Sequence, residues 1–153
     1  MKKSSVFYLV LLFFLASCGE KPLYEKAYSF KNREWKQDVK PVYNVEIADV
    51  KKAYSFTLSL RTTTNYKYSN LWIFMKTESP DGTIAREPFE IMITEENGKW
   101  IGNKTGSVVE TSLYFKKRTL PITGKYSFTI EQAITASTID EVLDIGFTVT
   151  KEK

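Results

Sequence analysis

Apolar and polar residues alternate along most of this chain, and the alternation predicts half-buried β-strands. Between residues 54 and 61, large apolar side chains interleave with Ser55, Thr57, Ser59 and Arg61. Successive side chains of a strand point to opposite faces of its sheet, so this segment has one apolar and one polar face. Further segments with this alternation contain Tyr43, Val45 and Ile47; Phe89, Ile91 and Ile93; Val109, Thr111, Leu113 and Phe115; Tyr126, Phe128 and Ile130; and Ile145, Phe147 and Val149.

The spacing of strands and turns favours a single all-β domain. The segment Leu71 to Met75 is apolar throughout and predicts a central strand buried on both sides. Residues 79–82 (Ser-Pro-Asp-Gly) and 96–99 (Glu-Asn-Gly-Lys) have the composition of hairpin turns. About eight short strands joined by such turns predict an antiparallel β-sandwich of the jelly-roll or immunoglobulin-like type. The residues expected inside it are Phe56, Leu58, Leu60, Ile73, Ile91, Leu113, Phe128, Ile130 and Phe147.

One short segment also has a helix signal. Between Ser137 and Leu143, Thr138 and Glu141 have the spacing of a capping box. A helix and a loop fit this segment equally well.

The start of the chain has the plan of a bacterial lipoprotein signal. Lys2 and Lys3 precede an apolar run over residues 6–16, and small residues stand just before Cys18. Spanning a bilayer needs roughly 20 apolar residues, so a permanent transmembrane helix is the weaker interpretation. An ordinary secretory signal is disfavoured because Cys18 is the only cysteine of the chain. We expect residues 1–17 to be removed and Cys18 to be lipidated.

Three segments follow from this assignment: a signal peptide over residues 1–17, a lipidated tether over 18–27 and the β-sandwich over 28–153. The tether is polar and contains Pro22. Extended chain spans at most about 3.6 Å per residue, so its nine residues after Cys18 reach about 32 Å. Lipidation leaves no thiol for a disulfide, a metal site or a nucleophile.

Composition disfavours catalysis and nucleic-acid binding. The chain has no histidine, which removes the commonest general base and the usual metal ligand. Asp140, Glu141 and Asp144 form the densest acidic cluster, but they lack the regular spacing of a calcium loop. We therefore expect no enzyme, no metal and no cofactor. The basic clusters 51–52 and 116–118 are too short for the basic stripe of a nucleic-acid binder.

Aromatic and amide residues at or beside the turns form the candidate interaction surface. Aromatic faces with amide neighbours suit glycans or peptides, whereas the favoured alternative is that the rings cap the ends of the core. The residues concerned are Trp35, Asn65, Tyr66, Tyr68, Asn70, Trp72 and Trp100.

A set of ordered segments carries a family resemblance across nearly the whole chain after Cys18. The segments are Asn65 to Trp72, Pro80 to Gly82, Gly98 to Gly102, Gly124 to Ala133 and Asp144 to Gly146. In this order, behind a lipoprotein signal, they resemble the GldH family of gliding-motility lipoproteins of Bacteroidetes. Residues 85–88 and 103–106 depart from the family pattern.

The resemblance implies a non-enzymatic component of the gliding machinery and of the protein-export apparatus that gliding uses. It implies partners among the other envelope proteins of that machinery, with the membrane contacted through the lipid on Cys18. A periplasm-facing position on the outer membrane is expected, because no run of acids follows Cys18. A surface glycan-binding lipoprotein is the alternative, and a small-molecule ligand is not expected.

Overall fold

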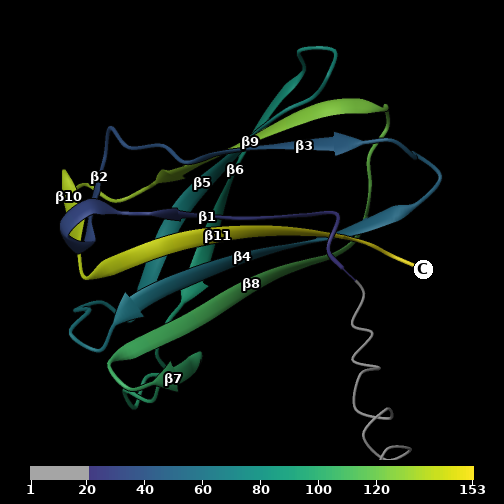
Figure 1. Ribbon diagram of the computed structural model, residues 1–153. Helices are drawn as coiled ribbons and strands as arrows, with labels where there is room; N and C mark the ends of the chain where they lie inside the picture. The colour runs from purple at the N-terminus through teal and green to yellow at the C-terminus, as the bar shows by residue number, and fades with distance from the viewer. Residues whose placement is uncertain (1–20) are drawn as a thin grey trace, which may run out of the picture.

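Alternating side chains place one face of each long strand in a common core. The computed structural model describes residues 21–153. In β4 (Ala53–Thr63), Tyr54, Phe56, Leu58 and Leu60 are buried, and the residues between them are half-exposed. The other strands bury their apolar faces in the same way, so two sheets pack face to face as an antiparallel sandwich (Figure 1).

The larger sheet has the order β1-β11-β4-β8-β7, the second sheet the order β3-β9-β5-β6, and β10 pairs with β2 in a two-stranded ribbon. Every strand pair is antiparallel. Besides β4, the elements are β1 (Tyr24–Ser29), η2 (Lys31–Arg33), β2 (Glu34–Lys36), β3 (Val42–Ile47), β5 (Asn70–Glu78), β6 (Ile84–Met92), β7 (Asn103–Thr105), β8 (Val108–Thr119), β9 (Gly124–Gln132), β10 (Thr138–Asp140) and β11 (Val142–Lys151).

The eight longer strands of residues 21–153 have the topology of a jelly roll. We leave out the three-residue strands β2, β7 and β10 and number the others from one to eight in chain order. Strands one, eight, three and six (β1, β11, β4 and β8) then form one sheet. Strands two, seven, four and five form the other, which is the jelly-roll order. The expected sandwich is confirmed, and its jelly-roll form is the one adopted.

Aromatic rings fill the space between the sheets. The ring of Phe147 lies 4.9 Å from that of Phe128, 5.3 Å from Tyr43 and 6.0 Å from Phe56, measured between centroids. The hydroxyl of Tyr43 donates to the carbonyl of Ile145 at 2.6 Å, so its polar end is satisfied inside the core. Of the nine expected core residues, only Leu113 is half-buried rather than buried.

The ordered domain begins earlier than residue 28. Tyr24–Ser29 forms β1, which pairs with β11 from Tyr24 opposite Val149 to Ser29 opposite Asp144. This segment is an edge strand whose residues are exposed except for the half-buried Tyr24, so it lacks the alternation that marks the inner strands. The signal peptide, Cys18 and the first residues of the tether lie outside the described residues.

Two local expectations are wrong. Leu71 to Met75 is not buried on both sides, because β5 is central in its sheet but leaves Trp72 42% exposed on the outward face. The segment from Ser137 to Leu143, for which a helix and a loop are equally expected, is neither, because Thr138–Asp140 forms the strand β10 and buries Ile139 opposite Trp35. Both expected hairpin turns are confirmed: Gly82 N–H donates to the Ser79 carbonyl and Gly98 N–H to the Glu95 carbonyl.

The free edge of the smaller sheet carries a proline. Pro88 lies in the middle of β6, opposite Phe74 of β5. The carbonyl of Trp72 accepts the N–H of Ala133, so the backbone polar groups of Trp72 point away from β6. Backbone direction repeats every second residue of a strand, so those of Phe74 point away from β6 as well. The nitrogen of Pro88 therefore faces the open edge, where no ladder hydrogen bond is lost. Within residues 21–153, no helix is long and apolar enough to cross a membrane.

Candidate functional site

A pocket of about 170 Å³ lies at the end of the sandwich where β4 connects to β5. The loop between these strands supplies Tyr66 and Tyr68, β5 supplies Asn70 and Trp72, and residues 134–136 close the other side. The structure thus brings together four of the seven residues proposed from sequence as an interaction surface.

Tyr66 forms the floor of this pocket. It is only 7% exposed, its hydroxyl donates to the carbonyl of Asn70 at 3.2 Å, and its N–H donates to the carbonyl of Thr63 at 3.1 Å. Burial is the main cause that raises the pKa of the Tyr66 hydroxyl, and the nearby Tyr68 raises it further. The hydroxyl is therefore a neutral donor at physiological pH. The ring of Tyr68 meets that of Tyr66 edge-on at 5.7 Å between centroids.

The rim of the pocket is exposed and aromatic. Tyr68 is 54% exposed and Trp72 42% exposed. The N–H of Ala133 donates to the carbonyl of Trp72 at 2.9 Å, which holds the segment after β9 beside the ring-bearing strand. The side-chain amide of Asn70 donates to the Glu90 carboxylate on the neighbouring strand β6. The pocket therefore has a fixed frame and two accessible rings.

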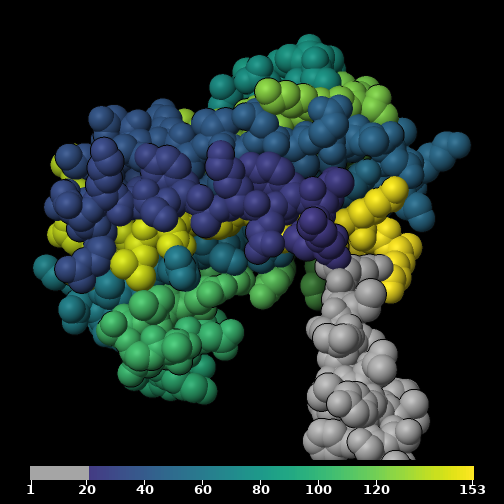
Figure 2. All heavy atoms as spheres, viewed as in Figure 1, coloured from purple at the N-terminus to yellow at the C-terminus, as the bar shows by residue number. Residues whose placement is uncertain are grey.

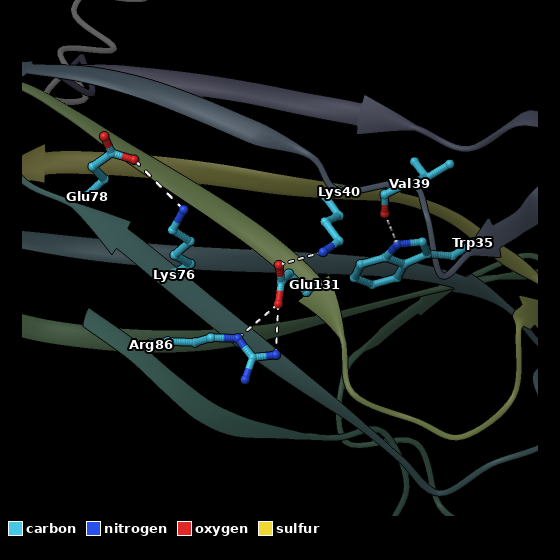
Figure 3. Close-up of polar contacts among 7 residues, drawn as sticks. All are labelled: Trp35, Val39, Lys40, Lys76, Glu78, Arg86 and Glu131. Carbon is cyan, nitrogen blue, oxygen red and sulfur yellow. Dashed lines mark hydrogen bonds and ion pairs between the residues drawn. The ribbon is translucent and has the colours of Figure 1, made fainter. Parts of the chain in front are cut away.

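The remaining three proposed residues lie elsewhere. Trp35 is fully buried, stacks on Phe30 at 4.8 Å and donates its indole N–H to the carbonyl of Val39 at 2.9 Å (Figure 3), so it is a core residue and not part of a surface. Trp100 is half-buried against the core and bridges to Thr94. Asn65 is exposed in the loop but does not line the pocket.

A charged cluster next to the pocket has no signal in the local sequence. Glu131 accepts from Lys40 at 2.9 Å, and from the Nε and Nη2 of Arg86 at 3.0 and 2.8 Å (Figure 3). The guanidinium of Arg86 also lies 3.5 Å from the ring centroid of Phe74. The hydrogen bond from Lys40 and, after it, that from Arg86 lower the pKa of Glu131, although partial burial opposes them.

The pocket and this charged cluster are continuous on the outward face of the smaller sheet. Trp72 and Phe74 are two residues apart on β5 and so share one face, and Phe74 lies opposite Glu131 of β9. Met92, 44% exposed, lies opposite Asn70. The hairpin turn at residues 79–82 sets the register of β5 and β6, so the position of Arg86 opposite Lys76 could be predicted from sequence. The pairing of β9 with β5, which brings Glu131 to Arg86, has no local sequence signal.

The acidic cluster suggested by the sequence is dispersed into structural contacts. Asp144 forms a two-pronged ion pair with Arg61 on β4. Glu141 accepts from the hydroxyl of Thr63 and from Arg33, the latter at 3.4 Å. Among the described residues, no group of three or more acids, histidines or cysteines is arranged to hold a metal ion.

Comparison with known proteins assigns the family. Residues 22–149 match the family model described as GldH lipoprotein. The chain belongs to this family. Similar proteins include the gliding motility lipoprotein GldH homolog of Christiangramia forsetii, 28% identical over 96% of this chain and 95% of that one. The gliding motility lipoprotein GldH of Flavobacterium johnsoniae is 26% identical over 96% of both chains.

Among solved structures, similarity extends to a carbohydrate-binding module specific for non-crystalline cellulose. That chain is 10% identical, with a TM-score of 0.48 over 84% of this chain and 73% of the other. The match to the GldH lipoprotein family model, by contrast, begins before β1 and ends at residue 149, within β11. The aromatic pocket and the Glu131 cluster therefore both lie within the part of the chain that the GldH family model matches.

Proposed function

We propose that this protein is a lipid-anchored, non-enzymatic component of the bacterial gliding machinery and its associated protein-export apparatus. Relatives named as gliding motility lipoproteins match it along almost their whole length, which supports the gliding role. The lipid on Cys18 holds it to the outer membrane, facing the periplasm. Its partners are other envelope proteins of the same machinery.

The observation that carries this proposal is the outward face formed by the aromatic pocket and the Glu131 cluster. Exposed Trp, Tyr, Met and Arg side chains are enriched where proteins bind one another. Here Trp72 and Met92 are exposed on one sheet face, Tyr68 is exposed in the loop just before β5, and Arg86 is held in place by Glu131 and Phe74. A preorganised surface of this kind loses little side-chain entropy when a partner binds.

The arrangement of acids supports a non-enzymatic role. A glycosidase-like mechanism needs two facing carboxyl groups, one of which retains its proton. Asp144 is instead committed to Arg61, and Glu131 to Lys40 and Arg86. The chain also has no histidine to act as a general base.

The test is the double variant Tyr68→Ala and Trp72→Ala in the full-length chain. We expect it to be as abundant and as firmly membrane-bound as wild type, because neither side chain is part of the buried core. We also expect colony spreading to be lost and co-purifying envelope proteins to disappear, since removing a binding hot spot of about 2 kcal/mol weakens binding about 30-fold.

The matched control is Tyr114→Ala, which removes a ring that is 63% exposed on the other sheet. It should leave spreading and co-purification unchanged. Normal spreading in the double variant would contradict the proposed site. If wild-type protein is instead retained on polysaccharide without protein partners, and the double variant is not, the aromatic pocket is a glycan site.

A further inference from the structure

The end of the sandwich opposite the aromatic pocket gathers five separate segments. Tyr24 lies opposite Val149, Lys151 opposite Tyr54, and Ala53 opposite Thr119, so the start of β1, the end of β11, the start of β4 and the end of β8 are neighbours. The hairpin after β5 joins them, because Pro80 packs against Gly124. Figure 2 shows the last residues of the chain, in yellow at the right of the view, at this end. We call residues 21–23, 48–53, 79–83, 116–124 and 151–153 the anchor end.

The anchor end holds a strong excess of basic residues. It carries eight lysines and arginines against three acids, whereas the rest of residues 21–153 carries 12 basic and 14 acidic residues. The asymmetry is therefore concentrated at one end of an otherwise slightly acidic domain. The basic residues, all exposed, are Lys21, Lys51, Lys52, Lys116, Lys117, Arg118, Lys151 and Lys153.

The acids of the anchor end are already engaged in local contacts. Asp49 pairs with Lys151 at 3.4 Å and accepts the N–H of Lys51, and Asp81 accepts the N–H of Thr83. Glu152 accepts the hydroxyl of Ser55. Four lysines meanwhile line one shallow depression of about 370 Å³, formed by Lys21, Lys52, Lys151 and Lys153 with Thr150 and Glu152. With four lysines against one glutamate, this depression is positively charged and favours an anionic counterpart.

A bulge in β8 brings a second basic group to the surface. Tyr54 pairs with Arg118 and Phe56 with Phe115, so Lys116 and Lys117 together oppose the single residue Ser55. Lys117 has a φ of 53°, which is uncommon for a residue other than glycine. The bulge breaks the in-and-out alternation, so residues 116–118 are all exposed.

Two exposed apolar side chains accompany the basic residues. Leu23 is 48% exposed and Val50 is 37% exposed, and both lie within two residues of a lysine. Apolar side chains flanked by lysines suit the boundary between lipid headgroups and acyl chains, because lysine stems lie along apolar surface while their charges stay in water.

We propose that the anchor end docks on the anionic headgroup surface of the membrane that holds this lipoprotein. The inference rests on the lipid anchor at Cys18. Residues 19–23 separate that cysteine from β1 and span at most about 18 Å, so the anchor end is the part of the domain nearest the bilayer. Headgroup charge acts over roughly 8 Å at physiological ionic strength, and docking brings the basic side chains of the anchor end within that distance of the headgroups.

Docking at this end orients the aromatic pocket away from the lipid. β4 runs from the anchor end at Ala53 to the pocket end at Thr63, and its 11 residues span about 36 Å. The pocket that we propose for partner binding would therefore be presented at a defined height above the membrane.

The experiment uses the lipidated full-length protein in vesicles with spin-labelled lipid as a quencher. Because Cys18 is alkylated in this form, a cysteine introduced at Ala48, in the anchor end, or at Asn97, in an exposed turn away from it, is the one free thiol to carry a fluorophore. Vesicles of phosphatidylcholine alone are compared with vesicles that also contain phosphatidylglycerol. Flotation of the vesicles confirms anchoring in each sample.

We expect lipid quenching at position 48 to be several-fold stronger with phosphatidylglycerol, and the gain to vanish in high salt. Replacing Lys51, Lys52, Lys116 and Lys117 by Gln should abolish the gain. The matched control replaces Lys31, Lys36, Lys67 and Lys104, which lie outside the anchor end, by Gln and should retain it. Position 97 should show little quenching throughout.

Equal quenching in both vesicle types, a gain that survives the neutralised anchor end, or stronger quenching at position 97 would each overturn the docking. Protein that does not float with the vesicles would show that the lipid anchor is missing and would overturn it as well. The partner surface is tested separately by the double variant Tyr68→Ala and Trp72→Ala, whose effect on co-purification does not depend on lipid charge.

Discussion

Phe128 shows how much of the stability depends on single buried rings. Its side chain is 3% exposed, and its ring lies 4.9 Å from that of Phe147 and 5.4 Å from that of Phe56, both on the opposite sheet. Thr129, the next residue, is half-buried on the outward face of the same strand. Neighbouring positions on β9 therefore have very different packing.

Phe128→Ala should lower the free energy of unfolding by about 3–5 kcal/mol, because a cavity is left among rings that cannot close over it. Thr129→Ala should lower it by less than about 1 kcal/mol. Urea unfolding followed by tryptophan fluorescence measures both. Equal losses would show that the two faces of β9 are wrongly assigned.

Glu131 makes stability depend on acid pH. Its pKa in the folded protein lies below the ordinary value of 4.5, chiefly through the hydrogen bond from Lys40 and then that from Arg86. A lowered folded pKa contributes stability that is present above pH 4.5 and is lost as pH falls through the folded value.

Glu131→Gln should therefore lower the thermal midpoint at pH 7, and the difference from wild type should shrink as pH falls below about 4. Thermal unfolding at a series of pH values measures this. Glu96→Gln removes the same charge from an exposed turn and controls for net charge. A difference from wild type that stays constant into acid would contradict the coupling of Glu131 to Lys40 and Arg86.

At the scale of elements, alternation in the sequence predicts the inner strands well and the edges poorly. β4, β9 and β11 each bury one face, and the burial forces the pattern. β1 is exposed except at Tyr24 and depends chiefly on hydrogen bonds to β11, which no alternation of apolar and polar residues reveals. The apparent helix cap at Thr138 and Glu141 is overridden because Ile139 is buried opposite Trp35.

The candidate site was predictable only in part for a related reason. Tyr66, Tyr68, Asn70 and Trp72 are close in sequence, so a loop and the start of one strand suffice to bring them together. Glu131 joins Arg86 and Lys40 from three separate segments, and their meeting depends on the order of strands in the sheet. Local pattern contains no information on that order.

The hairpin of β7 and β8 depends on one close backbone approach. A Cβ atom at Gly102 would lie 2.1 Å from the backbone oxygen of Glu110 on β8. Gly102→Ala should therefore displace β7 and lower the free energy of unfolding by about 1–3 kcal/mol. Amide hydrogen exchange should quicken at residues 103–110 first.

Ser107→Ala, at the exposed turn of the same hairpin, is the control and should change stability by less than about 0.5 kcal/mol. Unchanged exchange in Gly102→Ala would mean that β7 accommodates a side chain there without moving away from β8.

At the scale of the whole molecule, the proposed function depends on attachment as well as on fold. Because β1 begins at Tyr24, five residues and not the expected nine lie between Cys18 and the first strand, so the greatest distance they can span falls from about 32 Å to about 18 Å. The short tether therefore fixes the height of the domain, and a partner of the aromatic pocket meets it roughly the length of β4, about 36 Å, beyond the anchor end.

Cys18→Ala should abolish labelling with an alkyne fatty acid and should restore colony spreading poorly when it replaces the native chain. The reason is that a domain released from the membrane loses the high effective concentration near its partner. Spreading assays, with protein abundance and membrane fractionation as controls, measure this. Undiminished labelling of the variant would refute lipidation at Cys18.

Pro88 has a consequence for many copies held in one membrane. Anchored copies diffuse in a plane and meet edge to edge far more often than free molecules do, and an open strand edge is a template for joining sheets. The β6 edge exposes its backbone over Ile84–Met92, but the ring at position 88 removes a donor from the middle of that row. Pro88 therefore disfavours edge-to-edge joining of crowded copies into fibres.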